Sequence, residues 1–94
     1  MDKRTRRDLQ SVGIECFIRD FHLFRDETLT NKDVAIILEE KYGYTYKACS
    51  SRTTKARRII RSREDLTSAL SYIVYDAVKV TEQIKEDART LLES

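Results

Sequence analysis

The sequence predicts an all-α domain of four helices, and three observations support this fold class. The chain has no Pro and only two Gly, Gly13 and Gly43, too few for the many tight turns of β-sandwiches and barrels. Apolar residues recur at spacings of three and four along most of its length, as they do in helices packed on a core. With 94 residues, 40% of them hydrophobic, residues 1–94 have the size of a single domain.

Membrane-spanning and secreted classes are not expected. The longest uncharged stretch in the second half of the chain, residues 66–75, is about half the ~20 residues that a membrane helix requires. The first eight residues are strongly charged and no apolar segment follows them, which is unlike a secretory signal. The two cysteines, Cys16 and Cys49, lie in helix-like apolar patterns and fit a reducing compartment. We therefore expect a cytoplasmic protein without a membrane partner.

The first helix is expected over residues 4–24, where apolar residues form one buried stripe. This stripe consists of Leu9, Val12, Cys16, Phe17, Phe21 and Phe24. Residues 1–8, which overlap its start, hold four cations against two acids and form a basic arm. Such an arm could follow a DNA backbone or enter a minor groove. An unpinned terminal segment is more often disordered, and disorder is the alternative that we favour for it.

Two helices joined by a short turn are expected in the middle of the chain. Thr30 lies three residues before Asp33 in a variant capping box, so a helix should run from there to about residue 42. Gly43 supplies the left-handed residue that ends a helix, and Thr45 can cap the next one, over residues 46–61. The helical period places Tyr46, Cys49, Thr53, Ala56 and Ile60 on its core side, and Lys47, Ser51, Thr54, Lys55, Arg58 and Ser62 on its exposed side.

A long fourth helix is expected over residues 64–92. Ser62 followed by Asp65 repeats the capping pattern and separates this helix from the third. Apolar residues keep a seven-residue repeat at Leu66, Leu70, Ile73, Ala77, Val80, Ile84 and Leu91. Because a second apolar stripe lies beside the repeat, we expect one stripe to cover the domain and the other to form the seam of a homodimer. The alternative is that the repeat packs on the first helix of the same chain.

The charge is distributed unevenly along the chain, although the formal net charge is only +2. Residues 9–44 hold four cations against seven acids, and residues 64–94 hold three against seven. Residues 45–63, in contrast, hold seven cations and no acid. A positive block of this kind suits a polyanion such as nucleic acid, or an acidic protein surface. The plainer alternative is a solvated helix face, although such faces usually mix both signs.

A helix, a glycine turn and a basic helix over residues 30–61 predict a helix-turn-helix whose second helix would enter the DNA major groove. The residues YGYT followed by YKACSSRTTKARRII resemble the turn and recognition helix of helix-turn-helix regulators, most closely the promoter-reading domain of sigma factors. The resemblance implies that Thr45 caps the recognition helix. It also implies that Lys47, Ser50, Ser51 and Thr54 contact bases, while Arg57, Arg58 and Arg61 contact phosphates. Lys55 joins this DNA-binding set because it lies on the same exposed face.

The sequence carries little that indicates an enzyme. Cys16, His22 and Cys49 lack the spacing of metal ligands, no nucleophile pattern accompanies His22, and no glycine-rich phosphate loop is present. We therefore expect no metal, no cofactor and no small-molecule substrate. The function that the sequence predicts is sequence-specific binding of double-stranded DNA by a small dimeric transcriptional regulator. The alternative is a helical adaptor or inhibitor whose basic helix docks on an acidic protein.

Overall fold

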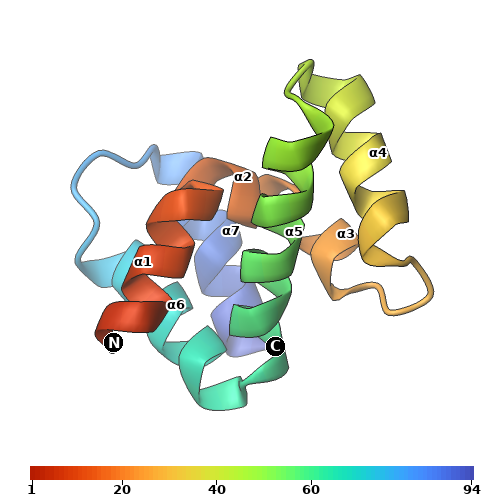
Figure 1. Ribbon diagram of the computed structural model, residues 1–94. Coiled ribbons are helices and arrows are strands. Elements are labelled where there is room, and N and C mark those ends of the chain that lie inside the picture. The colour runs from red at the N-terminus through yellow and green to blue at the C-terminus, as the bar shows by residue number, and fades with distance from the viewer.

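The computed structural model describes all 94 residues as seven helices without a strand (Figure 1). The helices are α1 (Lys3–Val12), α2 (Ile14–Arg19), α3 (Phe21–Arg25), α4 (Asn31–Tyr42), α5 (Tyr46–Arg61), α6 (Arg63–Tyr75) and α7 (Glu82–Glu93). The predicted all-α class is confirmed, whereas the arrangement of four helices is not what the chain adopts. None of the seven helices combines the length and the apolar character that crossing a membrane would require.

Helix α5 is the centre of the fold. It packs against α1 on one side and α4 on the other, and also against α3 and α6, while α7 packs on α6 and α2 (Figure 1). One cluster of 18 buried apolar residues joins these helices. Its largest fully buried side chains include Phe17, Phe24, Leu38, Ile59 and Ile73. Burial of this cluster, at about 25 cal/mol per Å² of apolar surface, is the main force that holds α5 in place.

The first predicted helix is broken into α1, α2 and α3. Gly13 ends α1 with φ +90° and ψ 128°, a conformation that favours glycine, and Asp20 separates α2 from α3. The side chain of Asp20 is fully buried, where it accepts hydrogen bonds from Lys41 Nζ at 2.7 Å and Tyr42 Oη at 2.6 Å. The apolar stripe remains buried apart from Cys16, which is half-buried. The periodicity therefore predicted the buried face correctly but not the two breaks.

The predicted basic arm of residues 1–8 is instead the first part of a packed helix. Asp2 caps α1 by accepting a hydrogen bond from the backbone N–H of Thr5 at 2.7 Å. This contact holds the pKa of the Asp2 carboxyl below its usual value. Thr5 and Asp8 are buried against the rest of the domain. The expectation of disorder was wrong because these two residues, polar in sequence, face the neighbouring helices.

The predicted long helix over residues 64–92 is two helices, α6 and α7, with residues 76–81 between them. Thr81 starts the second one by accepting a hydrogen bond from the backbone N–H of Ile84. Because of this break, the two helices fold back on each other and pack inside the chain (Figure 1). Leu70, Ile73, Ala77 and Ile84 are buried in this way, and Leu66, Val80 and Leu91 pack half-buried against the core. The continuous seam over residues 64–92 therefore does not exist, and its apolar residues pack inside the chain, chiefly between α6 and α7, with smaller contacts to α1 and α2 of the predicted first helix.

The termini of α4 and α5 follow the predicted capping chemistry. Thr30 and Asp33 form a reciprocal capping box, and hydrogen bonds from Thr28 and Thr30 hold the pKa values of Asp26 and Asp33 below normal. Gly43 is left-handed at φ +74°, and Thr45 caps α5. The predicted boundaries of both helices are confirmed.

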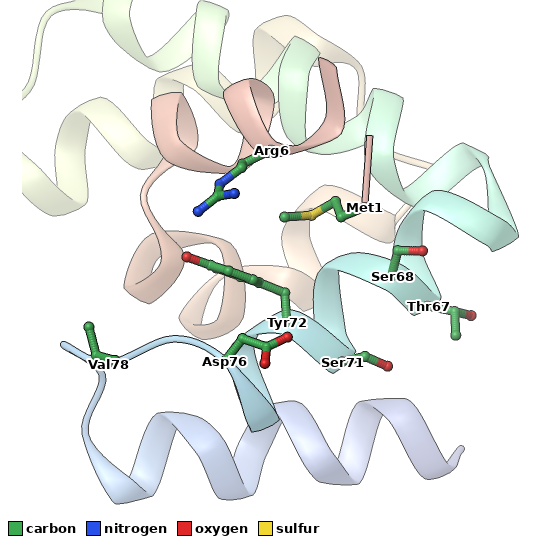
Figure 2. Close-up of a pocket in the computed structure, with 8 residues that line it drawn as sticks. All are labelled: Met1, Arg6, Thr67, Ser68, Ser71, Tyr72, Asp76 and Val78. Atoms are coloured by element: carbon green, nitrogen blue, oxygen red, sulfur yellow. The ribbon is translucent and has the colours of Figure 1, made fainter. Parts of the chain in front are cut away.

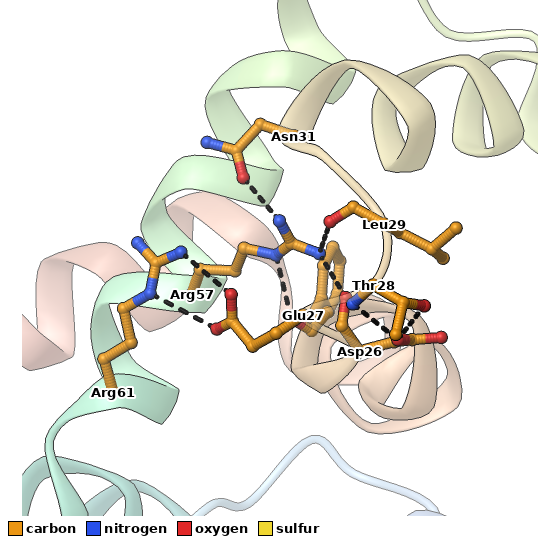
Figure 3. A network of polar contacts seen from close by, with 8 residues as sticks. Asp26, Glu27, Thr28, Leu29, Asn31, Arg57 and Arg61 are labelled. Carbon is orange, nitrogen blue, oxygen red and sulfur yellow. Dashed lines mark hydrogen bonds and ion pairs between the residues drawn. The ribbon is translucent and has the colours of Figure 1, made fainter.

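One buried cation, Arg57, connects α5 to the segment that precedes α4 (Figure 3). Its side chain is 2% exposed and donates hydrogen bonds to three backbone carbonyls and one amide oxygen at 2.7–2.9 Å. The acceptors are Phe24 O, Asp26 O, Leu29 O and Asn31 Oδ1. Burial of a cation is costly unless hydrogen bonds compensate it, and here four acceptors do so.

The contact between Arg57 and Asn31 also constrains how α4 and α5 cross. Arg57 lies three turns along α5 from the turn, and Asn31 lies at the far end of α4. The hydrogen bond from Arg57 Nη1 to Asn31 Oδ1, at 2.7 Å, thus joins the start of α4 to the second half of α5. The predicted turn between α4 and α5 is present.

We predict that Arg57→Ala lowers the free energy of unfolding by about 3 kcal/mol or more, because it leaves buried carbonyls without donors. Urea denaturation followed by circular dichroism measures this change. Arg61→Ala is the matched control, since Arg61 is exposed and pairs only with Glu27, and it should cost less than about 1 kcal/mol. Equal losses in the two variants would contradict the role assigned to Arg57.

Candidate nucleic-acid interface

The outward face of α5 carries a row of polar side chains that we call the basic ridge: Lys47, Ser51, Thr54, Arg58 and Arg61. All five are exposed. Their spacings of four, three, four and three residues follow the helical period and place them on one side of the helix. Ser50 and Lys55 flank the ridge and are half-buried. Helix α5 contains no acidic residue, so the ridge has no anion of its own.

The middle of the ridge is formed by short hydroxyl side chains. Thr54 Oγ1 donates a hydrogen bond to the backbone carbonyl of Ser50 at 3.0 Å, which holds the side chain against the helix. The ridge residues from Lys47 to Arg58, with Tyr46, Ser50 and Lys55, line a shallow concavity of about 400 Å³. Because these side chains are short, a ligand can approach the backbone of α5 in the middle of the ridge, between the cations at the two ends of the ridge.

The cations of the ridge differ in what they already contact. Arg58 pairs with the carboxylate of Asp8 at 2.9 Å, and Arg61 pairs with Glu27 at 3.5 Å. Lys55 Nζ donates to the hydroxyl of Ser11 at 2.7 Å. Lys47 has no carboxylate within 4.0 Å. Both lysines thus keep their charge uncompensated by a neighbouring anion.

Four of the seven cations of residues 45–63 are not ridge residues: Lys55 flanks the ridge, Arg63 begins α6, and Arg52 and Arg57 make contacts elsewhere. Arg57, predicted as a phosphate contact, is buried in the hydrogen-bond network described above and is not accessible to DNA, so this prediction was wrong. Arg52 lies over the ring of Tyr44, 4.3 Å from the centroid, and Tyr44 stacks on Tyr42. The remaining predicted residues, Lys47, Ser50, Ser51, Thr54, Lys55, Arg58 and Arg61, lie together on the outward side of α5.

The buried face of α5 is rotated relative to its predicted position. Cys49, Thr53 and Ala56 are buried as expected. Ile59, at 1% exposure, takes the place predicted for Ile60, which is only half-buried. Tyr46, predicted on the core side, is 42% exposed. The network around Arg57 explains the rotation, because it turns that side of the helix inward.

Helix α1 extends the positive surface beyond α5. The pairs Asp8–Arg58 and Ser11–Lys55 show that the two helices run antiparallel. Arg4, one turn before Asp8, therefore lies toward the end of α5 that carries Arg61. The predicted helix over residues 4–24 already contained Arg4, but the sequence did not show that this part of it lies beside α5.

A concavity of about 710 Å³ lies between α1, α6 and the 76–81 segment (Figure 2). Arg6 lies over the ring of Tyr72 there, 5.4 Å from the centroid, and Asp76 supplies a carboxylate. The lining thus carries one cation and one anion among its side chains, with hydroxyl groups from Thr67, Ser68 and Ser71. Because the two charges offset each other, this concavity should attract a polyanion less strongly than the basic ridge does.

The residue types that could ligate a metal are dispersed, and both cysteine thiols have raised pKa values. No three His, Cys, Asp or Glu residues lie close enough to hold a metal ion. Burial and the neighbouring carboxylate of Asp20 raise the pKa of the Cys16 thiol to about 11. Burial also raises the pKa of the Cys49 thiol. Both thiols are therefore protonated at neutral pH and are poor nucleophiles.

Comparisons of the chain with protein-family models, with curated proteins and with solved structures found no match. We therefore infer function from the geometry and charge of the surface itself.

We predict that Ile59→Ala lowers the free energy of unfolding by about 2–5 kcal/mol, because it empties a fully buried position. Ile60→Ala is the matched control and should cost on the order of 1 kcal/mol, since this side chain is half-buried. Urea denaturation of both variants measures the difference. A larger loss for Ile60→Ala would show that the buried face of α5 is the one predicted from sequence.

Proposed function

We propose that the protein binds double-stranded DNA through the basic ridge of α5, with α5 in the major groove. The observation that carries this proposal is the composition of the ridge: cations at its two ends, short hydroxyl side chains between them, and no acid on the helix. Lys47, Lys55 and Arg61 are assigned to phosphates, and Ser50, Ser51 and Thr54 to base edges. Sequence-specific binding of this kind suits a regulator of transcription.

The dimensions and chemistry of the ridge support duplex DNA as the ligand. Helix α5 has 16 residues and is about 24 Å long, and a major groove about 12 Å wide admits an α-helix. Cations neutralise phosphates and release counterions, which supplies affinity without sequence preference. Hydroxyl groups can donate to and accept from base edges, and their small size lets the helix come close. The extension toward Arg4 adds a further cation along the DNA backbone.

The binding unit in this proposal is the single chain. The homodimer expected from the sequence depended on a continuous seam over residues 64–92, and the structure uses that seam inside the domain. A two-fold pair of copies on DNA would need a different surface, with half-sites spaced by about 34 Å for one helical turn.

An acidic protein is the second candidate partner, and one observation favours it. Arg58 and Arg61 already pair with the carboxylates of Asp8 and Glu27, so the ridge accommodates carboxylates at these positions. A protein surface that presents Asp and Glu side chains could replace these pairs. Duplex DNA and such a protein differ in one measurable property, because binding to a rigid array of phosphates has a steep dependence on salt.

We predict that the double variant Lys47→Ala/Lys55→Ala binds random-sequence duplex DNA more weakly than the parent and with a weaker dependence on salt. Each lost phosphate contact should reduce the slope of log K against log salt concentration by about 0.9, so the two together reduce it by about 1.8. Fluorescence anisotropy with a labelled duplex at several salt concentrations measures both quantities.

The matched control is Lys85→Ala/Arg89→Ala, which removes the same charge from α7. Helix α7 packs on α6 and α2, away from the ridge, so this variant should keep the slope of the parent. Equal effects of the two double variants would indicate nonspecific attraction by net charge. An absence of duplex binding by the parent would contradict the proposed function.

A further inference from the structure

Arg58 differs from the other cations of the ridge because a second helix fixes its orientation. Both carboxylate oxygens of Asp8 on α1 contact it: Oδ1 accepts a hydrogen bond from Nη2 at 3.1 Å, and Oδ2 forms an ion pair with Nε at 2.9 Å. The Asp8 side chain is 8% exposed, so helix packing holds the acceptor in place. Such a bidentate contact restricts the rotation of the guanidinium group as well as its position.

The contact with Asp8 uses only one edge of the guanidinium group. Arginine has five N–H donors in a planar fork, and Asp8 contacts Nε and takes one N–H of Nη2. Both hydrogens of Nη1 and the second hydrogen of Nη2 remain. One hydrogen from each of these two nitrogens points along the end of the side chain, so the free end presents a parallel pair of donors.

Arg58 borders the surface assigned to base edges at its C-terminal end. Arg58 is 41% exposed, follows Thr54 by one turn and Ser51 by two, and helps to line the same concavity. Guanine presents two acceptors, O6 and N7, to the major groove, and a bidentate arginine fork matches them. An arginine held in advance by a carboxylate also loses less side-chain entropy on binding than a free one.

From this geometry we infer that Arg58 reads a guanine in the major groove, and that Asp8 is the residue that positions it. The inference rests on the proposed function, since it names the base that the ridge recognises. It changes the role expected from the sequence, in which Arg58 was a phosphate contact. Arg61 is the natural comparison, because its pairing with the exposed Glu27 is longer, at 3.5 Å for both contacts, and leaves it suited to a phosphate.

The experiment selects bound duplexes from a random pool and then measures the affinity of the selected site by anisotropy. For the parent we expect one guanine whose replacement by adenine weakens binding at least about fivefold. Arg58→Lys keeps the charge but removes the fork, so it should abolish this discrimination. Asp8→Asn, which keeps the side-chain volume, should reduce the discrimination in the same direction. Arg61→Lys is the matched control and should keep the parent's preference for guanine at this position.

The outcomes separate this inference from the proposed function. If the parent binds duplex through Lys47 and Lys55 but Arg58→Lys keeps the same guanine preference, the reading role of Arg58 is overturned and DNA binding stands. Loss of the preference in Arg61→Lys as well would also overturn it, because the effect would then follow any arginine of the ridge. If no duplex is selected from the pool, both the reading role of Arg58 and the proposed DNA binding are contradicted. Circular dichroism and thermal unfolding of Asp8→Asn verify that the variant is folded in each case.

Discussion

The buried guanidinium group of Arg57 sets the orientation of α5, and the rest of the functional surface depends on that orientation. Its four hydrogen bonds join the end of α3, the loop after it and the start of α4 to one side of α5. Adjacent residues of a helix differ by about 100° in direction, so an inward Arg57 leaves Arg58 pointing outward. The same constraint brings Ile59 into the core and turns Ile60 toward its edge. A single internal cation therefore decides which cations remain on the surface.

The parts of the fold that local chemistry determines could be predicted from the sequence. Capping and turn signals act within a few residues of the chain, and they predicted both ends of α4 and the start of α5 through Thr30, Gly43 and Thr45. The period of α5 likewise predicted that Lys47, Ser51 and Thr54 share an exposed face. These predictions needed no knowledge of what packs against the helix, which is why they agree with the structure.

The parts that depend on contacts between distant segments could not be predicted in this way. Nothing in a run of seven cations marks Arg57 as the buried one, because its acceptors are backbone carbonyls 28 to 33 residues away. Asp20 breaks the first helix where its carboxylate meets Lys41 and Tyr42 of α4, again a long-range contact. Residues 76–81, where the chain breaks between α6 and α7, contain no Gly or Pro, and the seven-residue apolar repeat continues across them, so the sequence predicted one continuous helix. In each case tertiary packing decided the outcome over local pattern.

The proposed function places the outward side of α5, extended by α1, against the duplex. Amide chemical-shift mapping of the ¹⁵N-labelled protein during titration with an unlabelled duplex tests this placement, because it reports on every helix at once without a substitution. We expect the largest changes in α5 and in the first half of α1, with little change in α7. Changes concentrated around the concavity between α1, α6 and the 76–81 segment, or no changes at saturating duplex, would contradict it.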